Sequence, residues 1–138
     1  MGLQKILLQQ HVGTLCQAVV NVGDKVKKGS LIAKPTGLGA NIFSSVYGEV
    51  KEITKDAIII KKDENQAEEF IKLEGEDKFQ LIKDAGILGM CGAGFPTSAK
   101  LGTKVKYILV NAAECEPLLH HNIDQIIEKT DMTIRGLK

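Results

Sequence analysis

The sequence predicts an α+β protein, a small β domain followed by the start of an α/β domain. Up to about residue 62 the apolar residues form short runs separated by turn residues, as in small sheets. From residue 77 onward, helical patterns flank a glycine-rich stretch. Residues 106–111, with Ile108, Leu109 and Val110 in succession, are typical of a buried parallel strand. The chain of 138 residues has room for one domain or for two small units.

Composition excludes several classes of protein. The content of 43% hydrophobic and 25% charged residues is that of an ordinary globular protein, and the net charge of +1 gives no basic footprint for nucleic acid. No apolar run is long enough to span a membrane, and residues 1–8 are too short for a signal peptide. The three cysteines are widely spaced and form no C-x-x-C, so we expect a cytoplasmic protein without an internal iron–sulfur or zinc site.

The β region divides at its turn residues. Gly23-Asp24 separates apolar-rich runs at residues 17–22 and 25–34, and further apolar residues follow at 41–46. Residues 48–54 and 57–61 are the two clearest strands, and Lys55-Asp56 is the expected hairpin turn between them. In the first of these strands, we expect Val50 and Ile53 to face inward.

The order of turns and apolar residues between His11 and Ile32 resembles the barrel-sandwich hybrid of lipoyl and biotinyl domains. Those domains carry a prosthetic group on a lysine at a hairpin tip. Here Lys34 is followed by Pro35, and no Met-Lys-Met is present. We therefore expect residues 1–62 to form a carrier-like domain without a modified lysine.

Residues 63–76 form the predicted connector between the domains. They are acidic and polar, which favours a solvated linker over a functional acidic patch, with one edge strand added at residues 69–73. Asp77 is a suitable cap for a helix over residues 77–85, which ends at Gly86.

The glycine-rich stretch runs from Gly89 to Thr97 and is the strongest candidate site. Glycines without a Cβ let backbone amides approach a ligand, and curled amides attract anions such as phosphate. Thr97 is the expected N-cap of a short helix at residues 98–100, whose positive end would face the loop. A plain tight turn is the alternative.

After the predicted strand at 106–111, residues 122–129 are amphipathic, and residues 131–137 are suited to a further helix. The strand ends at Asn111, a position at which α/β sheets place ligand-binding residues.

Three motifs carry a more specific resemblance. Gly-Met-Cys-Gly-Ala-Gly-Phe-Pro-Thr at residues 89–97 and Asn-Ala-Ala-Glu-Cys-Glu-Pro at residues 111–117 resemble the flavin-binding region of RnfC-type electron-transport proteins. They resemble, more distantly, the 51 kDa flavoprotein subunit of respiratory NADH dehydrogenase. Residues 40–48 resemble the N-terminal domain of RnfC-type proteins, with the proline-reductase-associated type nearest. Such proteins are longer, so residues 77–138 are expected to be the truncated start of a flavin mononucleotide (FMN) domain.

The resemblance implies roles for individual residues. It implies cofactor binding by Gly89, Gly92, Ala93, Gly94, Lys100, Asn111 and Glu114. It places Glu116 near the nicotinamide that stacks on the flavin. Cys91 stands where the family usually has glycine, and a thiolate there would be reactive.

Plainer alternatives exist for several of these residues. Lys100 would be an exposed helix lysine, and Glu114 and Glu116 would coat a loop. His11 is predicted to be a hydrogen-bonded turn histidine, and Cys16 a strand residue.

The function implied by the resemblance is electron transfer between NADH and an iron–sulfur partner through FMN, as one component of an NADH-linked flavin oxidoreductase. Its iron–sulfur cluster would lie outside this chain, and its partners would be other subunits of a complex, peripheral to a membrane. FMN binding to this chain alone is expected to be weak. Two other hypotheses remain open: a non-catalytic docking module of a redox complex, and a thiol-redox protein that uses Cys91.

Overall fold

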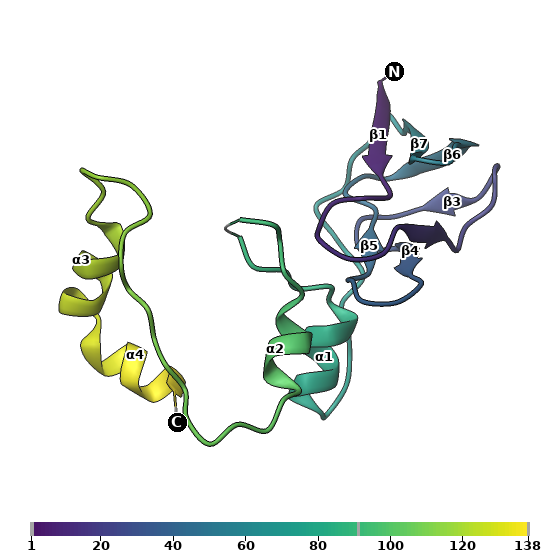
Figure 1. Cartoon of the computed structure of the whole chain (residues 1–138). Coiled ribbons are helices and arrows are strands. Elements are labelled where there is room, and N and C mark those ends of the chain that lie inside the picture. Colours follow the sequence, from purple (N-terminus) through teal and green to yellow (C-terminus); the bar gives the residue numbers. More distant parts are fainter. Residues whose placement is uncertain (1, 91, 138) are drawn as a thin grey trace. The chain divides into compact units, whose positions relative to one another are not determined.

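The computed structural model describes residues 2–90 and 92–137. The chain divides into two compact units, Met1–Thr103 and Lys104–Lys138. The first contains all the labelled strands and helices α1 and α2, and the second contains α3 and α4 (Figure 1). The mixture of helices and sheets in the chain as a whole agrees with the predicted α+β class.

The β domain consists of two antiparallel sheets. The larger has the order β1 (Leu3–Leu7), β7 (Ala57–Lys62), β6 (Gly48–Ile53) and β3 (Lys25–Val26). The smaller has the order β2 (Cys16–Ala18), β4 (Leu31–Pro35) and β5 (Ile42–Phe43). The sheets do not close into one barrel. Lys34 pairs with Gln17 within the second sheet, so it does not lie at a hairpin tip.

The core lies between strands whose inward residues are β-branched. Ile32, Val50, Ile58 and Ile60 are completely buried. Ile53 also packs against this core, although strict alternation from Val50 would turn it outward. The register of β6 on β7 shifts between Val50 and Glu52, and this irregularity restores the inward direction at Ile53. The predicted inward positions are therefore confirmed.

The β6–β7 hairpin turns at Lys55-Asp56, as predicted. Thr54 accepts two amide bonds through its hydroxyl, from Asp56 N at 3.3 Å and from Ala57 N at 3.0 Å. At the other end of β6, an ideal Cβ on Gly48 would lie 2.2 Å from the Lys61 carbonyl oxygen. Only glycine permits this close approach of the two strands.

The connector is held to the β domain without forming a strand. Gln66 exchanges hydrogen bonds with the Tyr47 backbone, and the Ile71 amide donates to the Lys28 carbonyl at 2.9 Å. The prediction of an edge strand at residues 69–73 is wrong. Lys28 lies in the turn after β3, so no ladder of backbone partners continues beyond this bond.

Helix α1 (Lys78–Asp84) begins and ends as predicted. The Asp77 carboxylate accepts from the Phe79 amide at 2.9 Å, and Gly86 follows the helix with a φ of 65°. In contrast, Thr97 is the first residue of α2 (Thr97–Leu101) and not its N-cap. The Thr97 amide donates to the Ile87 carbonyl at 3.0 Å, so the loop closure and not a side-chain cap begins this helix.

The second unit contains α3 (His121–Glu128) and α4 (Thr130–Leu137), which match the two predicted helices within a residue or two. The predicted strand at residues 106–111 is wrong for this structure. The segment is irregular and exposed, with Leu109 93% accessible. A parallel strand needs neighbours that satisfy its backbone groups, and the described part of this unit contains no strand. In residues 2–90 and 92–137, no helix has the length and apolar character needed to cross a membrane.

Candidate functional site

The glycine loop is a closed hairpin-like turn between α1 and α2. The Gly89 amide donates to the Phe95 carbonyl at 2.9 Å, and an isolated bridge pairs Leu88 with Pro96. Near the tip, Gly92 and Gly94 have φ values of 66° and 67°. L-residues rarely adopt this conformation, so both glycines are required by the backbone.

The two glycines face different surroundings. An ideal Cβ on Gly92 would meet no atom within 4 Å, whereas one on Gly94 would lie 3.4 Å from the His11 Cβ. The tip is therefore open at Gly92 and packed against the β domain at Gly94. Cys91 lies outside the described residues, so its predicted reactivity remains a prediction.

Lys100 lies beside this loop. Its Nζ is 5.5 Å from the centroid of the Phe95 ring, a distance at which a cation is attracted to an aromatic face. The structure thus places Lys100 beside Phe95, one residue of the loop. The side chain is exposed, as the plainer alternative expected.

The β domain contacts the loop directly, which the sequence did not suggest. The Val12 amide donates to the Ala93 carbonyl at 2.8 Å. The neighbouring His11 is buried, and its Nε2 accepts from the Ala40 amide at 3.2 Å. Nδ1 therefore carries the proton and donates to the Val12 carbonyl at 2.9 Å. The prediction of a hydrogen-bonded turn histidine is confirmed, and so is that of Cys16 as a strand residue.

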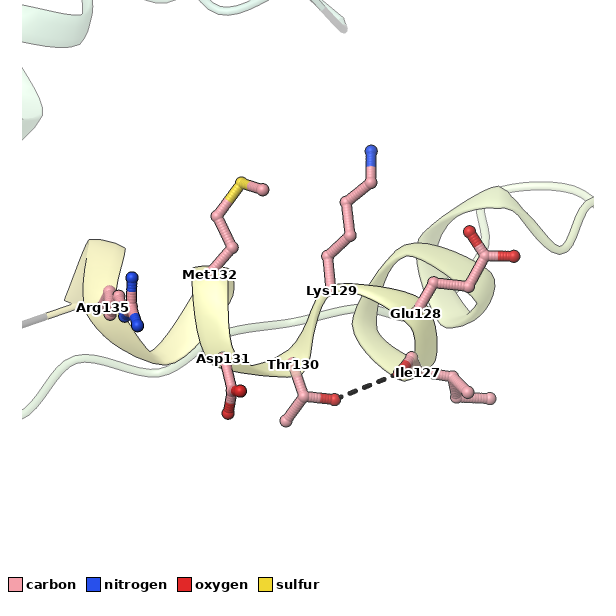
Figure 2. Close-up of a pocket in the computed structure, with 7 residues that line it drawn as sticks. All are labelled: Ile127, Glu128, Lys129, Thr130, Asp131, Met132 and Arg135. Atoms are coloured by element: carbon pink, nitrogen blue, oxygen red, sulfur yellow. Dashed lines mark hydrogen bonds between the residues drawn. The ribbon is translucent and has the colours of Figure 1, made fainter.

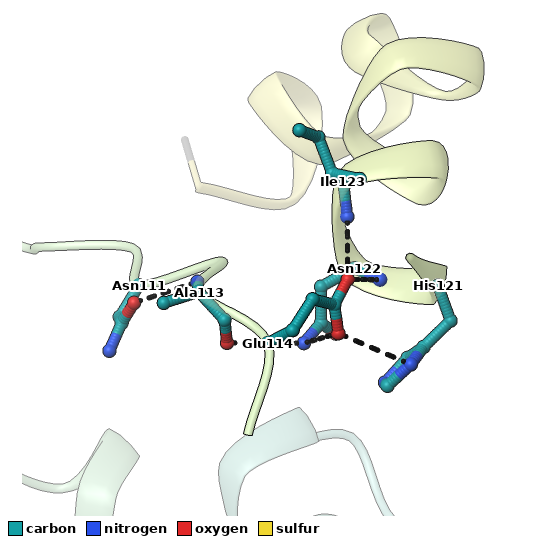
Figure 3. A network of polar contacts seen from close by, with 6 residues as sticks. All are labelled: Asn111, Ala113, Glu114, His121, Asn122 and Ile123. Atoms are coloured by element: carbon teal, nitrogen blue, oxygen red, sulfur yellow. Dashed lines mark hydrogen bonds and ion pairs between the residues drawn. The ribbon is translucent and has the colours of Figure 1, made fainter. Parts of the chain in front are cut away.

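The other predicted residues belong to the second unit, where Glu114 is the centre of a polar network (Figure 3). Its carboxylate accepts from the amides of Asn122 at 2.7 Å and Ile123 at 3.2 Å, and from Asn122 Nδ2 at 3.0 Å. His121 Nδ1 lies 3.3 Å from the same carboxylate. These amides are the second and third of α3, so Glu114 caps the helix from upstream. His120, at the N-cap position, provides no side-chain bond.

The side chains of Asn111 and Glu116 make fewer hydrogen bonds than that of Glu114. The Asn111 side-chain oxygen accepts from the Ala113 amide at 2.9 Å, which shapes its own loop. Glu116 is exposed, and its carboxylate has no hydrogen-bond partner among the described residues. The predicted site residues therefore form two sets, the loop with Lys100 in the first unit and Asn111 to Glu116 in the second.

A hollow between α3 and α4 carries no site of this kind. Its lining mixes Glu128 and Asp131 with Lys129 and Arg135, and the Thr130 hydroxyl donates back to the carbonyls of α3 (Figure 2). Within the described residues no three His, Cys, Asp or Glu side chains gather as a metal site would require.

Comparison with known families agrees with this architecture. The RnfC barrel sandwich hybrid domain family matches residues 4–75, more than half of the chain. The chain belongs to the RnfC family. The Nuo51 FMN-binding domain family matches residues 82–138, which include the glycine loop of this RnfC protein and its Glu114 network. The predicted order, a barrel-sandwich domain followed by part of an FMN-binding domain, is thus confirmed.

Individual relatives point the same way. One relative, a component of the proton-translocating ferredoxin:NAD(+) oxidoreductase complex of Clostridium ljungdahlii, is 34% identical over 96% of this chain and 34% of its own length. A component of the ion-translocating oxidoreductase complex of Haemophilus influenzae is 31% identical, over 96% of this chain and 19% of that protein. Its counterpart in Serratia proteamaculans is 32% identical, over 92% and 22%. The chain spans about a third or less of the length of these curated relatives.

Proposed function

We propose that this RnfC-family chain is an electron-transfer component in which the glycine loop holds the phosphate of FMN. The observation that carries the proposal is the pair of positive-φ glycines, Gly92 and Gly94, at the tip of a closed loop inside the segment matched by the FMN-binding domain family. Domain limits of 1–62, 63–76 and 77–138 belong to the same proposal.

The residues of the loop are chemically suited to a phosphate. A phosphate monoester carries about −1.5 to −2 charges near neutral pH. Backbone amides near Gly92 can approach it because, among the described residues that are not its chain neighbours, none comes within 4 Å of an ideal Cβ at that position. Lys100, on the helix that leaves the loop, adds a positive charge. Gly89 and Ala93 would shape the loop, since Gly89 closes it and Ala93 joins it to the β domain.

For the second unit, we propose that Asn111, Glu114 and Glu116 contribute polar groups to flavin binding, as the resemblance implies. Bound FMN would supply the hydride and one-electron chemistry, while the protein orients it and sets its electrostatic surroundings. Glu114 is suited to this because its carboxylate is already held in one orientation by α3. The exposed carboxylate of Glu116 is free to face a nicotinamide ring.

The donor and acceptor are proposed from the relatives. The C. ljungdahlii relative is named as part of a ferredoxin:NAD(+) oxidoreductase complex, which supports NADH on one side and an iron–sulfur protein on the other. Other subunits of such a complex would be the partners of this chain, in a location peripheral to the membrane.

A second candidate, a docking module of a redox complex, is favoured by one observation. Residues 107–110, Tyr-Ile-Leu-Val, are all at least 52% exposed. Exposed apolar patches commonly mark protein interaction sites.

Titration of the purified chain with FMN, followed by flavin fluorescence, tests the first proposal. We expect weak but saturable binding up to millimolar FMN, and we expect Lys100→Met to weaken it further, about tenfold, the effect of about 1.4 kcal/mol. Lys104→Met, an exposed lysine past the end of α2, is the matched control and should bind as the wild type does. The absence of saturable binding by the wild-type chain would contradict the FMN proposal and favour the docking module.

A further inference from the structure

We propose that the barrel-sandwich domain is the platform that positions the glycine loop, and that Asn41 and His11 are its positioning residues. The link to flavin rests on the proposed function above. The positioning of the loop by the β domain is supported by contacts inside the first unit.

The first contact is at the entry to the loop. Asn41 Nδ2 donates to the carbonyl of Asp84, the last residue of α1, at 3.0 Å. Two residues later, the chain passes so close to Asn41 that an ideal Cβ on Gly86 would lie 2.4 Å from the Asn41 carbonyl oxygen. The end of α1, and with it the start of the loop, is therefore fixed against the β domain.

The second contact is at the tip. The Val12 amide donates to the Ala93 carbonyl at 2.8 Å, and Gly94 packs against the backbone and Cβ of His11. The two contacts thus hold residues 84–94 at both ends, with Gly89 and Gly92 between them.

The His11 ring joins the two contacts. Its Nδ1 donates to the carbonyl of Val12, which holds the tip, and its Nε2 accepts from the amide of Ala40, the neighbour of Asn41. His11 is 6% exposed, and an ideal Cβ on Gly39 would lie 2.7 Å from its Cε1 atom. Because the ring has little room and both nitrogens are engaged, His11 holds residues 11–12 and 40–41 together.

A loop held at its entry and at its tip needs little ordering when a ligand arrives. Binding then loses less conformational entropy than binding to a free loop would. The β domain would therefore contribute to FMN affinity through Asn41 and His11, although neither belongs to the predicted phosphate contacts.

Hydrogen exchange of the whole chain tests this. The amides of Gly89 and Thr97 report the closed loop, and those of Val50 and Ile60 report the sheet. Asn41→Asp keeps the side-chain shape but replaces the Nδ2 donor with an oxygen. Asn41→Ala removes the side-chain amide altogether. We expect the ratio of loop to sheet exchange rates to rise roughly fivefold in both variants, the factor of one ordinary hydrogen bond. Asn65→Ala, at an exposed connector position, is the matched control and should leave the ratio unchanged.

The same variants are then titrated with FMN, and we expect the dissociation constant to rise by a similar factor. An unchanged exchange ratio in both variants would overturn the positioning role, whatever FMN does. A raised ratio together with no FMN binding by the wild-type chain would sustain the positioning role and reject the proposed cofactor. Because the criterion is a ratio, general destabilisation that speeds both sets of amides equally counts against the proposal.

Discussion

Glu114 and Asn122 hold each other through both the backbone and the side chain of the asparagine. The Glu114 carboxylate accepts the Asn122 amide at 2.7 Å and its Nδ2 at 3.0 Å (Figure 3). The two residues are eight positions apart, so this contact closes residues 115–121 into a loop that leads into the start of α3. A residue expected to line a cofactor is also the cap that begins a helix.

Removal of this cap should weaken α3. We expect Glu114→Ala to cost the helix about 0.5–2 kcal/mol, the usual range for a lost N-cap. The loss should appear as lower helical circular dichroism and faster exchange at the amides of Asn122 and Ile123. Glu116→Ala, which removes an exposed carboxylate two residues away, is the stability control. Equal helicity in both variants would show that the carboxylate does not stabilise α3.

Substitution by alanine should change stability in opposite directions at two glycines. Gly48→Ala places a Cβ 2.2 Å from the Lys61 oxygen, so strand β6 must shift, and we expect a loss of about 1–3 kcal/mol in unfolding free energy. Gly136 lies in α4 with open space around it, and alanine there should stabilise the helix by about 0.5–1 kcal/mol. Urea denaturation measures the first and helical circular dichroism the second. A stable Gly48→Ala protein would mean that β6 and β7 can separate without loss.

The buried thiol of Cys16 should make stability fall at alkaline pH. Burial raises the pKa of Cys16, so the folded state disfavours its thiolate. The stability that the protonated Cys16 thiol contributes is then fully present below the unfolded pKa of about 8.5. It is lost as pH rises through the folded pKa. In urea denaturation from pH 7 to 10, the wild type should lose more stability than Cys16→Ala. Parallel curves would contradict this.

Alkylation gives an independent check on the same thiol. Cys16 is 1% exposed, whereas Cys115 is exposed. Iodoacetamide should therefore label Cys115 well before Cys16, as followed by peptide mass spectrometry. The reverse order would show that the β domain opens readily around Cys16.

Two lysines beside Glu49 on the larger sheet should determine the pKa of its carboxyl group. Hydrogen bonds from Lys51 and Lys25 hold the pKa of Glu49 below its usual range. The contribution of this cluster is therefore present above the unfolded pKa of about 4.3 and is lost as pH falls through the folded value. Carboxyl NMR titration should show the pKa of Glu49 rising in Lys51→Met, while Lys55→Met leaves it unchanged. Because the group is at the surface, added salt should reduce the shift.

The local features of this protein could be predicted from residues that are close together in the chain. Turn residues at Gly23-Asp24 and Lys55-Asp56, and the Asp77 cap, act within a few residues of themselves, so their effects can be predicted without a fold. The resemblance of residues 89–97 and 111–117 to flavin-binding motifs likewise needs only the order of residues, and the family matches confirm it.

The features that depend on partners distant in the sequence became visible in the folded chain. Residues 106–111 have the composition of a buried strand, but a strand exists only where neighbouring strands pair with it, and the described residues of the second unit offer none. The inward direction of Ile53 depends on an irregularity against β7. Asn41 contacts the end of α1, and residues 11–12 contact the tip of the glycine loop, each across more than 40 residues of sequence. Such long-range contacts leave no local pattern, so the periodicity of the sequence does not predict them.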